Sequence, residues 1–208
     1  GIALAYDLIK SRNLINVLLL VGDVLSKFLN KSDFGTVSVF GDAGSATLIT
    51  NRDKNIKYLY NTGVIPNSSE ALHLGNSPLE DNELRMDGFR VFNFAINNIP
   101  EIINHSKKLW KLKFGEEPKI DFYALHQANN MILDHVLKKM NLDKSIMPTN
   151  IHMFGNTSGV TIPLLLCTDN LNINISDLIL FCGFGVGLSW SVLIQEDINL
   201  VSKNILYK

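Results

Sequence analysis

Two periods of apolar residues alternate along this chain, one typical of strands and the other of helices. Residues 120–125 are rich in alternating apolar and aromatic side chains, which predicts a short strand ending at His126. Residues 127–140 carry apolar side chains at helical spacing, and Lys138 and Lys139 stand in the last turn, where cations favour the helix dipole. The pattern predicts a strand followed directly by a helix, with a histidine at the junction.

A helix, a strand, a turn and a second strand are predicted twice in the same order. The later copy has its helix at residues 159–167, its strands at 177–182 and 188–194, and a glycine turn at 184–187. The earlier copy begins with an apolar helix at residue 1, followed by a strand at 16–22 that we expect to be covered on both faces. The chain then continues with a polar connection at 24–34. After it come a strand at 36–40, a glycine turn at 41–44 and a strand at 45–49. The recurrence predicts an internally duplicated α/β fold, in which Gly159 corresponds to Gly1.

The middle of the chain is less regular. Residues 50–85 carry clusters of Asn, Gly, Pro and Ser, which predict surface loops with short strands at 56–60 and 72–74. From residue 88 onward, apolar side chains at helical spacing predict an amphipathic helix that is interrupted or bent near Pro100.

Composition narrows the class of protein. The chain has 208 residues, 46% of them hydrophobic, and a net charge of −1, which predicts a globular protein with a real core and gives no indication of nucleic-acid binding. The apolar runs are too short to span a bilayer, so no membrane association is expected. Cys167 and Cys182 stand inside apolar runs, a pattern of buried thiols in a reducing compartment. We therefore expect a cytoplasmic protein.

Two polar residues mark helix starts and suggest chemistry. His126 stands where the strand at 120–125 gives way to a helix, and Asn156 precedes the apolar run at 160–167. A neutral imidazole N–H and an amide NH₂ are uncharged donors, and two such donors converging on one point would stabilise a developing oxyanion, such as a thioester enolate. The alternatives are structural: a histidine held at a strand end, and an asparagine that only caps a helix.

Several motifs occur in a specific order along the chain. They are His126-Gln127-Ala128-Asn129, Gly155-Asn156-Thr157-Ser158 and residues 184–190, preceded by Gly41-Asp42-Ala43-Gly44 and residues 86–92. Together they resemble the β-ketoacyl-acyl-carrier-protein synthase III family. The resemblance covers nearly all of this chain but not all of the family's protein. It implies a thiolase-like α/β fold with duplicated halves in α-β-α-β-α layers, the first half incomplete. The expected division is residues 1–62 for the first half, 63–87 for the connecting segment and 88–208 for the second half.

The resemblance also implies a reaction, a decarboxylative Claisen condensation of an acyl thioester with a malonyl thioester. His126 and Asn156 would stabilise the enolate, and the backbone N–H of Val186 would serve the acyl carbonyl oxygen. Gly88, Phe92 and Asn129 are expected at the pantetheine channel, where Asn129 would order the histidine loop more than react. No metal and no cofactor are expected, because thioesters of coenzyme A or phosphopantetheine are the substrates.

The partners implied by the resemblance are acyl carrier protein, acyl-CoA and malonyl thioesters, and a second copy of the chain in a homodimer. Lys138 and Lys139 match basic positions that receive the acidic carrier. Other positions depart from the family: Asn93 replaces a common Lys, Met131 a common Arg, and Phe34 an Arg that often helps to hold coenzyme A. Carrier docking is therefore less well supported than the chemistry.

In the family a nucleophilic cysteine lies just upstream of a glycine that Gly1 matches, at the N-terminus of the first helix. We expect this cysteine ahead of Gly1, and we expect the 208-residue chain alone to aggregate because it exposes sheet edges and apolar faces. Two alternatives stay open. One is an acyltransferase of specialised metabolism that needs no decarboxylation, and the other is a non-catalytic subunit paired with an active paralogue.

Overall fold

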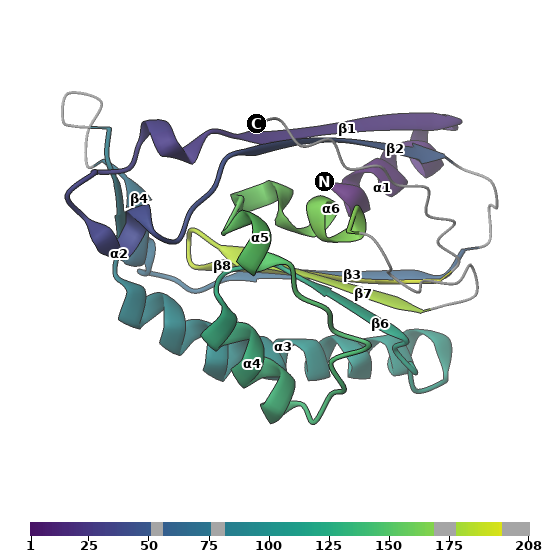
Figure 1. The fold of residues 1–208 in the computed structure, drawn as a ribbon. Coiled ribbons are helices and arrows are strands. Elements are labelled where there is room, and N and C mark those ends of the chain that lie inside the picture. The colour runs from purple at the N-terminus through teal and green to yellow at the C-terminus, as the bar shows by residue number, and fades with distance from the viewer. Residues whose placement is uncertain (51–55, 76–81, 169–177, 197–208) are drawn as a thin grey trace.

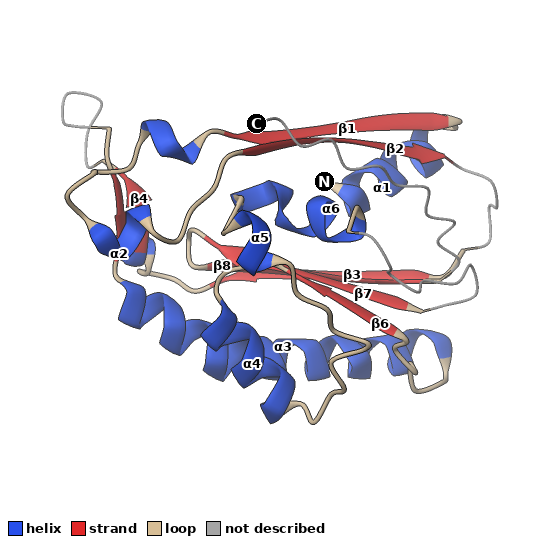
Figure 2. Cartoon of the chain, in the orientation of Figure 1, coloured by secondary structure: helices blue, strands red, loops and turns tan. Residues whose placement is uncertain are grey.

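The described part of the chain forms two main sheets and a small third one, with helices between the main sheets and a further pair of helices below the larger of them (Figures 1 and 2). The structure is a computed structural model that describes residues 1–50, 56–75, 82–168 and 178–196. Within these ranges, no helix combines the length and the apolar character that crossing a membrane requires.

The first sheet is an antiparallel pair, β1 (Asn16–Asp23) and β2 (Ala43–Thr50). Their register sets Gly22 opposite Gly44. The connection holds a 3₁₀ turn, η1 (Leu25–Lys27), and a short helix, α2 (Phe34–Val37). The strand predicted at 36–40 is therefore wrong. Although Thr36 and its neighbours favour strands, the Asp33 side chain caps a helical turn by accepting the backbone N–H of Gly35 at 3.0 Å.

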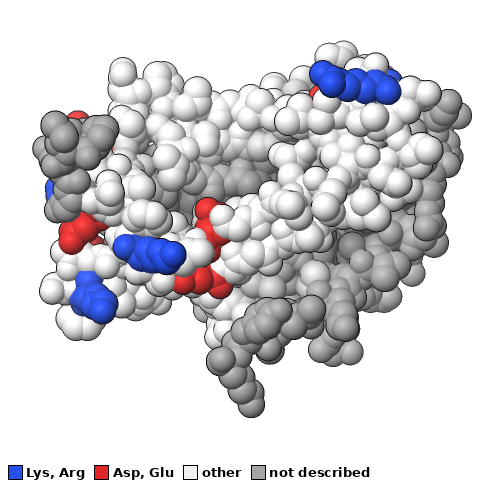
Figure 3. Space-filling model, turned by 90° about the horizontal axis from the view of Figure 1, so that it is seen from above, with Lys and Arg blue, Asp and Glu red and all other residues white. Residues whose placement is uncertain are grey.

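The expectation that the strand at 16–22 is covered on both faces is also wrong. Exposure alternates along β1, and the inward side chains pack with the helix α1 (Ile2–Arg12). The outward Leu18, Leu20 and Leu48 are 58%, 68% and 63% exposed. Figure 3 looks onto this side of the molecule and shows few charged side chains over it. The sheet is thus buried on one face only within the described chain.

The second sheet has four strands in the order β3-β8-β7-β6. They are β3 (Tyr58–Val64), β6 (Phe122–Leu125), β7 (Ile179–Gly185) and β8 (Ser189–Gln195), and only β6 and β7 are parallel. β3 pairs with β8 along its whole length. The expected boundary at residue 62 falls inside β3, and the division into halves stays a prediction.

Helices cover both faces of the four-stranded sheet. On one face lie α3 (Gly88–Phe114) and α4 (Asn130–Lys139), and on the other lie α1 and α6 (Thr161–Leu166). The short elements are η2 (Ser69–Ala71), β4 (Leu72–Leu74) paired with β5 (Leu84–Met86), α5 (Ile151–Phe154) and η3 (Ser158–Val160). Helix α3 runs through Pro100 without interruption for 27 residues.

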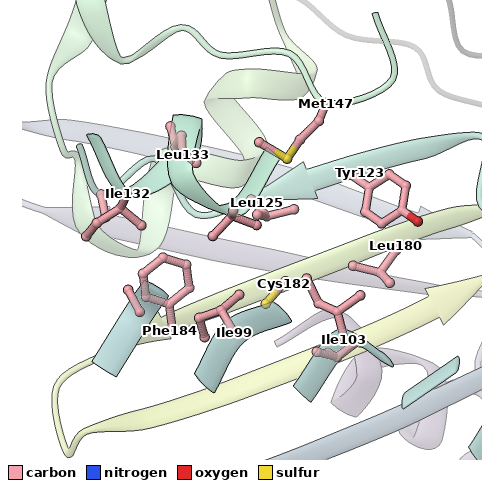
Figure 4. Packing of buried hydrophobic residues seen from close by; sticks show 14 of the residues in the cluster. Ile99, Ile103, Tyr123, Leu125, Ile132, Leu133, Met147, Leu180, Cys182 and Phe184 are labelled. Atoms are coloured by element: carbon pink, nitrogen blue, oxygen red, sulfur yellow. The ribbon is translucent and has the colours of Figure 1, made fainter. Parts of the chain in front are cut away.

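The larger core lies between this sheet and helices α3 and α4 (Figure 4). Ile99 and Ile103 of α3 meet Leu125 of β6 and Leu180 of β7 there, all of them at most 1% exposed. Cys182 joins this core, and burial raises the pKa of its thiol to about 12, as expected for a structural cysteine. Cys167 is only half-buried, and both thiols are free. The helix predicted at 127–140 also places His135 on its apolar face, but His135 is exposed on α4.

The predicted duplication is visible in the arrangement of the elements. Helix α1 leads into the pair β1–β2, and α6 leads into the pair β7–β8, with both helices between the two sheets. The copies differ in the connection between their strands, which is three residues in the second and contains η1 and α2 in the first. Four layers follow in order: the β1–β2 sheet, the central helices, the four-stranded sheet, and α3 with α4 (Figure 2).

Candidate active site

His126 stands at the carboxyl end of β6, where the chain turns toward α4. Its backbone N–H donates to Cys182 O at 2.8 Å, which extends the β6–β7 ladder by one bond. The next side chain, Gln127, is buried, donates to Leu125 O at 2.8 Å and accepts the Asn150 N–H at 3.1 Å. These bonds fix the backbone that carries His126.

The surroundings of His126 keep its ring uncharged. The aromatic ring of Phe184, from the end of β7, meets the imidazole edge-on, with centroids 5.1 Å apart. Burial lowers the pKa of His126 to about 4, so the ring is neutral at physiological pH. A neutral imidazole is the uncharged donor that the sequence analysis predicts.

Asn156 lies on the loop between α5 and η3 and is 8% exposed. Its Oδ1 accepts the backbone N–H of Ser158 at 2.9 Å, which orients the amide and leaves the NH₂ group as a donor. Within the described residues this NH₂ has no hydrogen-bond partner. The side chain therefore both holds the local turn and leaves a donor available.

The loop of Asn156 is also bound to the first half of the chain. Asn156 N–H donates to Val39 O at 2.8 Å, and Gly41 N–H donates to Asn156 O at 3.0 Å. This approach needs glycine, because a Cβ at Gly41 would lie 2.2 Å from Phe154 O. Gly41 thus allows a backbone contact that positions Asn156.

His126 and Asn156 are connected through Ser158. Its N–H bonds Asn156, and its carbonyl lies 3.0 Å from the Oγ1 of Thr161. Thr161 Oγ1 in turn lies 2.6 Å from His126 Nδ1. The structure thus brings the two predicted catalytic residues together around Ser158 and Thr161, with Nε2 of His126 and Nδ2 of Asn156 left for a substrate.

The turn between β7 and β8 contains Val186, which is 59% exposed. Its carbonyl accepts the Ser189 hydroxyl at 2.6 Å, and its N–H has no partner among the described residues. Ser68 holds the far side of the turn, with its Oγ 2.6 Å from Gly187 O and also accepting the Leu188 N–H. The Val186 N–H is thus free to donate, and its role at an acyl carbonyl stays a prediction.

The three residues expected at the pantetheine channel have separate places. Gly88 is the exposed first residue of α3, after the cap Asp87, and a Cβ there would meet nothing within 4 Å. Phe92, one turn later, is half-buried against the core. Asn129 caps α4 by accepting the Ile132 N–H at 2.8 Å. The cap explains Asn129 without a substrate, and its channel role stays a prediction, as do those of Gly88 and Phe92.

Lys138 and Lys139 are exposed in the last turn of α4. Lys139 Nζ donates to Ile96 O of α3 at 3.1 Å, which links the two helices. The part of these residues in carrier docking is untested.

Sequence reasoning missed two side chains that contact His126. Thr161 stands inside an apolar run, and the sequence places Phe184 only in a glycine turn. Both contacts join segments far apart in the sequence, so no local pattern signals them. The one available hint for Thr161 is its spacing of five residues from Asn156 in the same helix start.

Comparison with known proteins identifies the family of the chain. The profile of the family described as 3-oxoacyl-[acyl-carrier-protein] synthase III matches residues 1–63, and the profile of its C-terminal part matches residues 116–196. Together these matches take in more than half of the chain.

Curated relatives named beta-ketoacyl-[acyl-carrier-protein] synthase III include one from Streptococcus agalactiae serotype III, 35% identical over 94% of this chain and 64% of the relative. Another from Clostridium perfringens is 32% identical over 91% of this chain and 62% of the relative. The chain thus spans under two thirds of the curated relatives it matches.

Solved structures share the fold. A 3-oxoacyl-(acyl-carrier-protein) synthase from Burkholderia xenovorans superposes with a TM-score of 0.85 at 28% identity, covering 97% of this chain and 62% of that one. The synthase III of Thermus thermophilus gives a TM-score of 0.82 at 28% identity, covering 96% and 64%. These matches confirm the predicted thiolase-like fold, and with the family profiles they show that the chain belongs to the 3-oxoacyl-(acyl-carrier-protein) synthase III family.

Proposed function

We propose that this chain carries the decarboxylation and condensation site of an acyltransferase that joins an acyl thioester to a malonyl thioester, in fatty acid or related acyl-chain synthesis. The observation that carries the proposal is the pair of uncharged donors, His126 and Asn156, joined through Ser158 and Thr161. Membership of the synthase III family supports the same reaction.

The first step breaks the bond between the malonyl α-carbon and its carboxylate, and CO₂ leaves. The electron pair moves into the thioester, whose oxygen becomes negative. His126 Nε2–H and Asn156 Nδ2–H would donate to that oxygen, and two neutral donors stabilise an enolate without adding a charge that would hold the substrate carboxylate.

The second step forms the new carbon–carbon bond. The enolate carbon attacks the carbonyl of an acyl group held as a thioester on a cysteine, and the thiolate leaves. We place this cysteine ahead of Gly1, at the start of helix α1. The packing of the N-terminal turn of α1 beside α6, between the sheets, supports this position (Figure 1). A helix N-terminus stabilises a thiolate, and the Val186 N–H would serve the oxyanion of the attacked carbonyl.

The substrates under this proposal are acyl-CoA and a malonyl group on acyl carrier protein, which would dock on Lys138 and Lys139. The carrier named by the family supports the partner class, and the exposed lysines support an acidic one. A cytoplasmic homodimer belongs to the same proposal, and two free thiols support a reducing compartment.

Replacing the donors one at a time tests the proposal. In the full-length protein, His126→Ala and Asn156→Ala should each lower the rate of CO₂ release from a malonyl thioester by about 100- to 1,000-fold, because each removes one oxyanion donor. Release of labelled CO₂ measures the step without the condensation.

His135→Ala is the matched control, since His135 is exposed on α4 and contacts neither donor. It should leave the rate unchanged. Wild-type decarboxylation in both donor variants would reject the proposal and favour an acyltransferase that needs no decarboxylation. No decarboxylation in the wild-type protein would favour a non-catalytic subunit.

A further inference from the structure

The hydroxyl of Thr161 is the one group among the described residues that hydrogen-bonds the ring of His126. Thr161 is 2% exposed, and its Oγ1 lies 2.6 Å from Nδ1 of the imidazole. The same oxygen lies 3.0 Å from Ser158 O. A hydroxyl has a single proton, so it donates to only one of these two neighbours at a time.

Each choice fixes a different tautomer of His126. If Thr161 donates to Ser158 O, then Nδ1 of the neutral ring must bear the proton, and Nε2 presents a lone pair. If Thr161 donates to Nδ1, the ring proton lies on Nε2, which then presents a donor. The direction of one hydroxyl therefore decides whether the open side of the ring donates or accepts.

The backbone carbonyl of Ser158 does not depend on the Thr161 hydroxyl, which can therefore donate to His126. Ser158 O already accepts the backbone N–H of Thr161, so this carbonyl has a hydrogen-bond partner even when the side chain donates elsewhere. Nδ1 of His126 has no other partner in the described part of the chain. The shorter of the two contacts is also the one to Nδ1.

We propose that Thr161 is a positioning residue: its hydroxyl donates to Nδ1 of His126, fixes the orientation of the ring and holds the ring proton on Nε2. The oxyanion donor is thus set before the substrate arrives. Thr161 touches no substrate, and its effect passes entirely through His126. This inference rests on the proposed function for its catalytic consequence, although the tautomer itself does not depend on it.

Two measurements on the full-length protein test the inference. The first is the tautomer of His126, read from ¹⁵N–¹H correlations of the imidazole ring in the ¹⁵N-labelled wild-type protein. We expect a protonated Nε2 and an unprotonated, hydrogen-bonded Nδ1. A protonated Nδ1 would overturn the inference whatever the activity of any variant.

The second measurement is the rate of malonyl thioester decarboxylation in Thr161 variants. Thr161→Val keeps the β-branched shape and removes the hydroxyl, and it should lower kcat by about 10- to 100-fold with little change in KM, since a misplaced catalytic group costs rate more than binding. Thr161→Ser keeps the hydroxyl and should restore most of the rate.

Thr157→Val is the matched control. Thr157 is 1% exposed on the same segment, and its hydroxyl has no hydrogen-bond partner in the described ranges, so the same chemical change should leave kcat unaltered. A Thr161→Val rate equal to wild type would overturn the inference even where His126→Ala is inactive. Full activity of His126→Ala would reject the proposed function instead, and the tautomer would still decide the role of Thr161.

Discussion

At the scale of single residues, the candidate site depends on a histidine, His126, that burial keeps uncharged. Among the described residues, the specific contacts of the His126 imidazole are Thr161 and the ring of Phe184, and burial lowers its pKa to about 4. A charged imidazolium would attract the malonyl carboxylate and oppose its departure. Neutrality is therefore part of the chemistry as well as a result of packing.

This pKa makes the stability of the folded protein depend on pH. The unfolded chain binds a proton at His126 near pH 6.5, whereas the folded chain binds it only near pH 4. Protons therefore favour unfolding between these values: the contribution is complete above pH 6.5 and is lost as pH falls toward 4, by about 3 kcal/mol in all.

Urea unfolding of wild-type and His126→Gln full-length protein at several pH values would measure this contribution. The wild-type free energy of unfolding should fall more steeply than that of the variant between pH 6.5 and 4. Parallel curves would show that the histidine is not held neutral.

At the scale of elements, His126 and Asn156 were predictable because each stands at the end or the start of a segment with a regular apolar pattern. His126 ends a strand and Asn156 precedes a helix, so their polarity was visible against the apolar pattern. Thr161 was not predictable, since a threonine in an apolar helix carries no local signal and its contact to His126 spans 35 residues. The segment at 36–40 was misassigned because the Asp33 cap outweighs the strand preference of the residues that follow.

The glycines at 41–44 also have roles that a local sequence pattern does not reveal. The sequence predicts a turn, but Gly44 lies in β2 and Gly41 allows the chain to approach Asn156. We expect Gly41→Ala to push the loop of Asn156 away and to lower malonyl decarboxylation by about 10- to 100-fold, because displacement of a catalytic group by about 1 Å costs that much.

Gly44→Ala is the control, since its Cβ would meet nothing closer than Val21 O at 3.9 Å. Rates of CO₂ release and thermal unfolding should be measured for both variants. A lower rate without a lower unfolding temperature would indicate a displaced loop, and a lower unfolding temperature would indicate a loss of folding. Equal rates in the two variants would refute the positioning role of Gly41.

At the scale of the whole molecule, the two sheets differ in how they are covered. Both faces of the four-stranded sheet are buried, whereas the outer face of β1–β2 is exposed within the described chain. Leu18 and Leu48 face each other directly across this pair, and Leu20 lies beside them. Three large apolar side chains thus form a contiguous exposed patch, with one edge of each strand unpaired among the described residues.

This patch predicts that the 208-residue chain expressed alone associates with itself. Replacing the facing pair by opposite charges, Leu18→Lys with Leu48→Glu, should shift the chain toward monomer in sedimentation velocity, because the cross-strand pair stays favourable while the apolar patch is lost. Leu112→Lys is the matched control: Leu112 is 83% exposed on α3 but lies outside the patch, so its replacement should leave association unchanged. A monomeric wild-type chain, or equal relief by Leu112→Lys, would mean that the outer face of β1–β2 does not drive association.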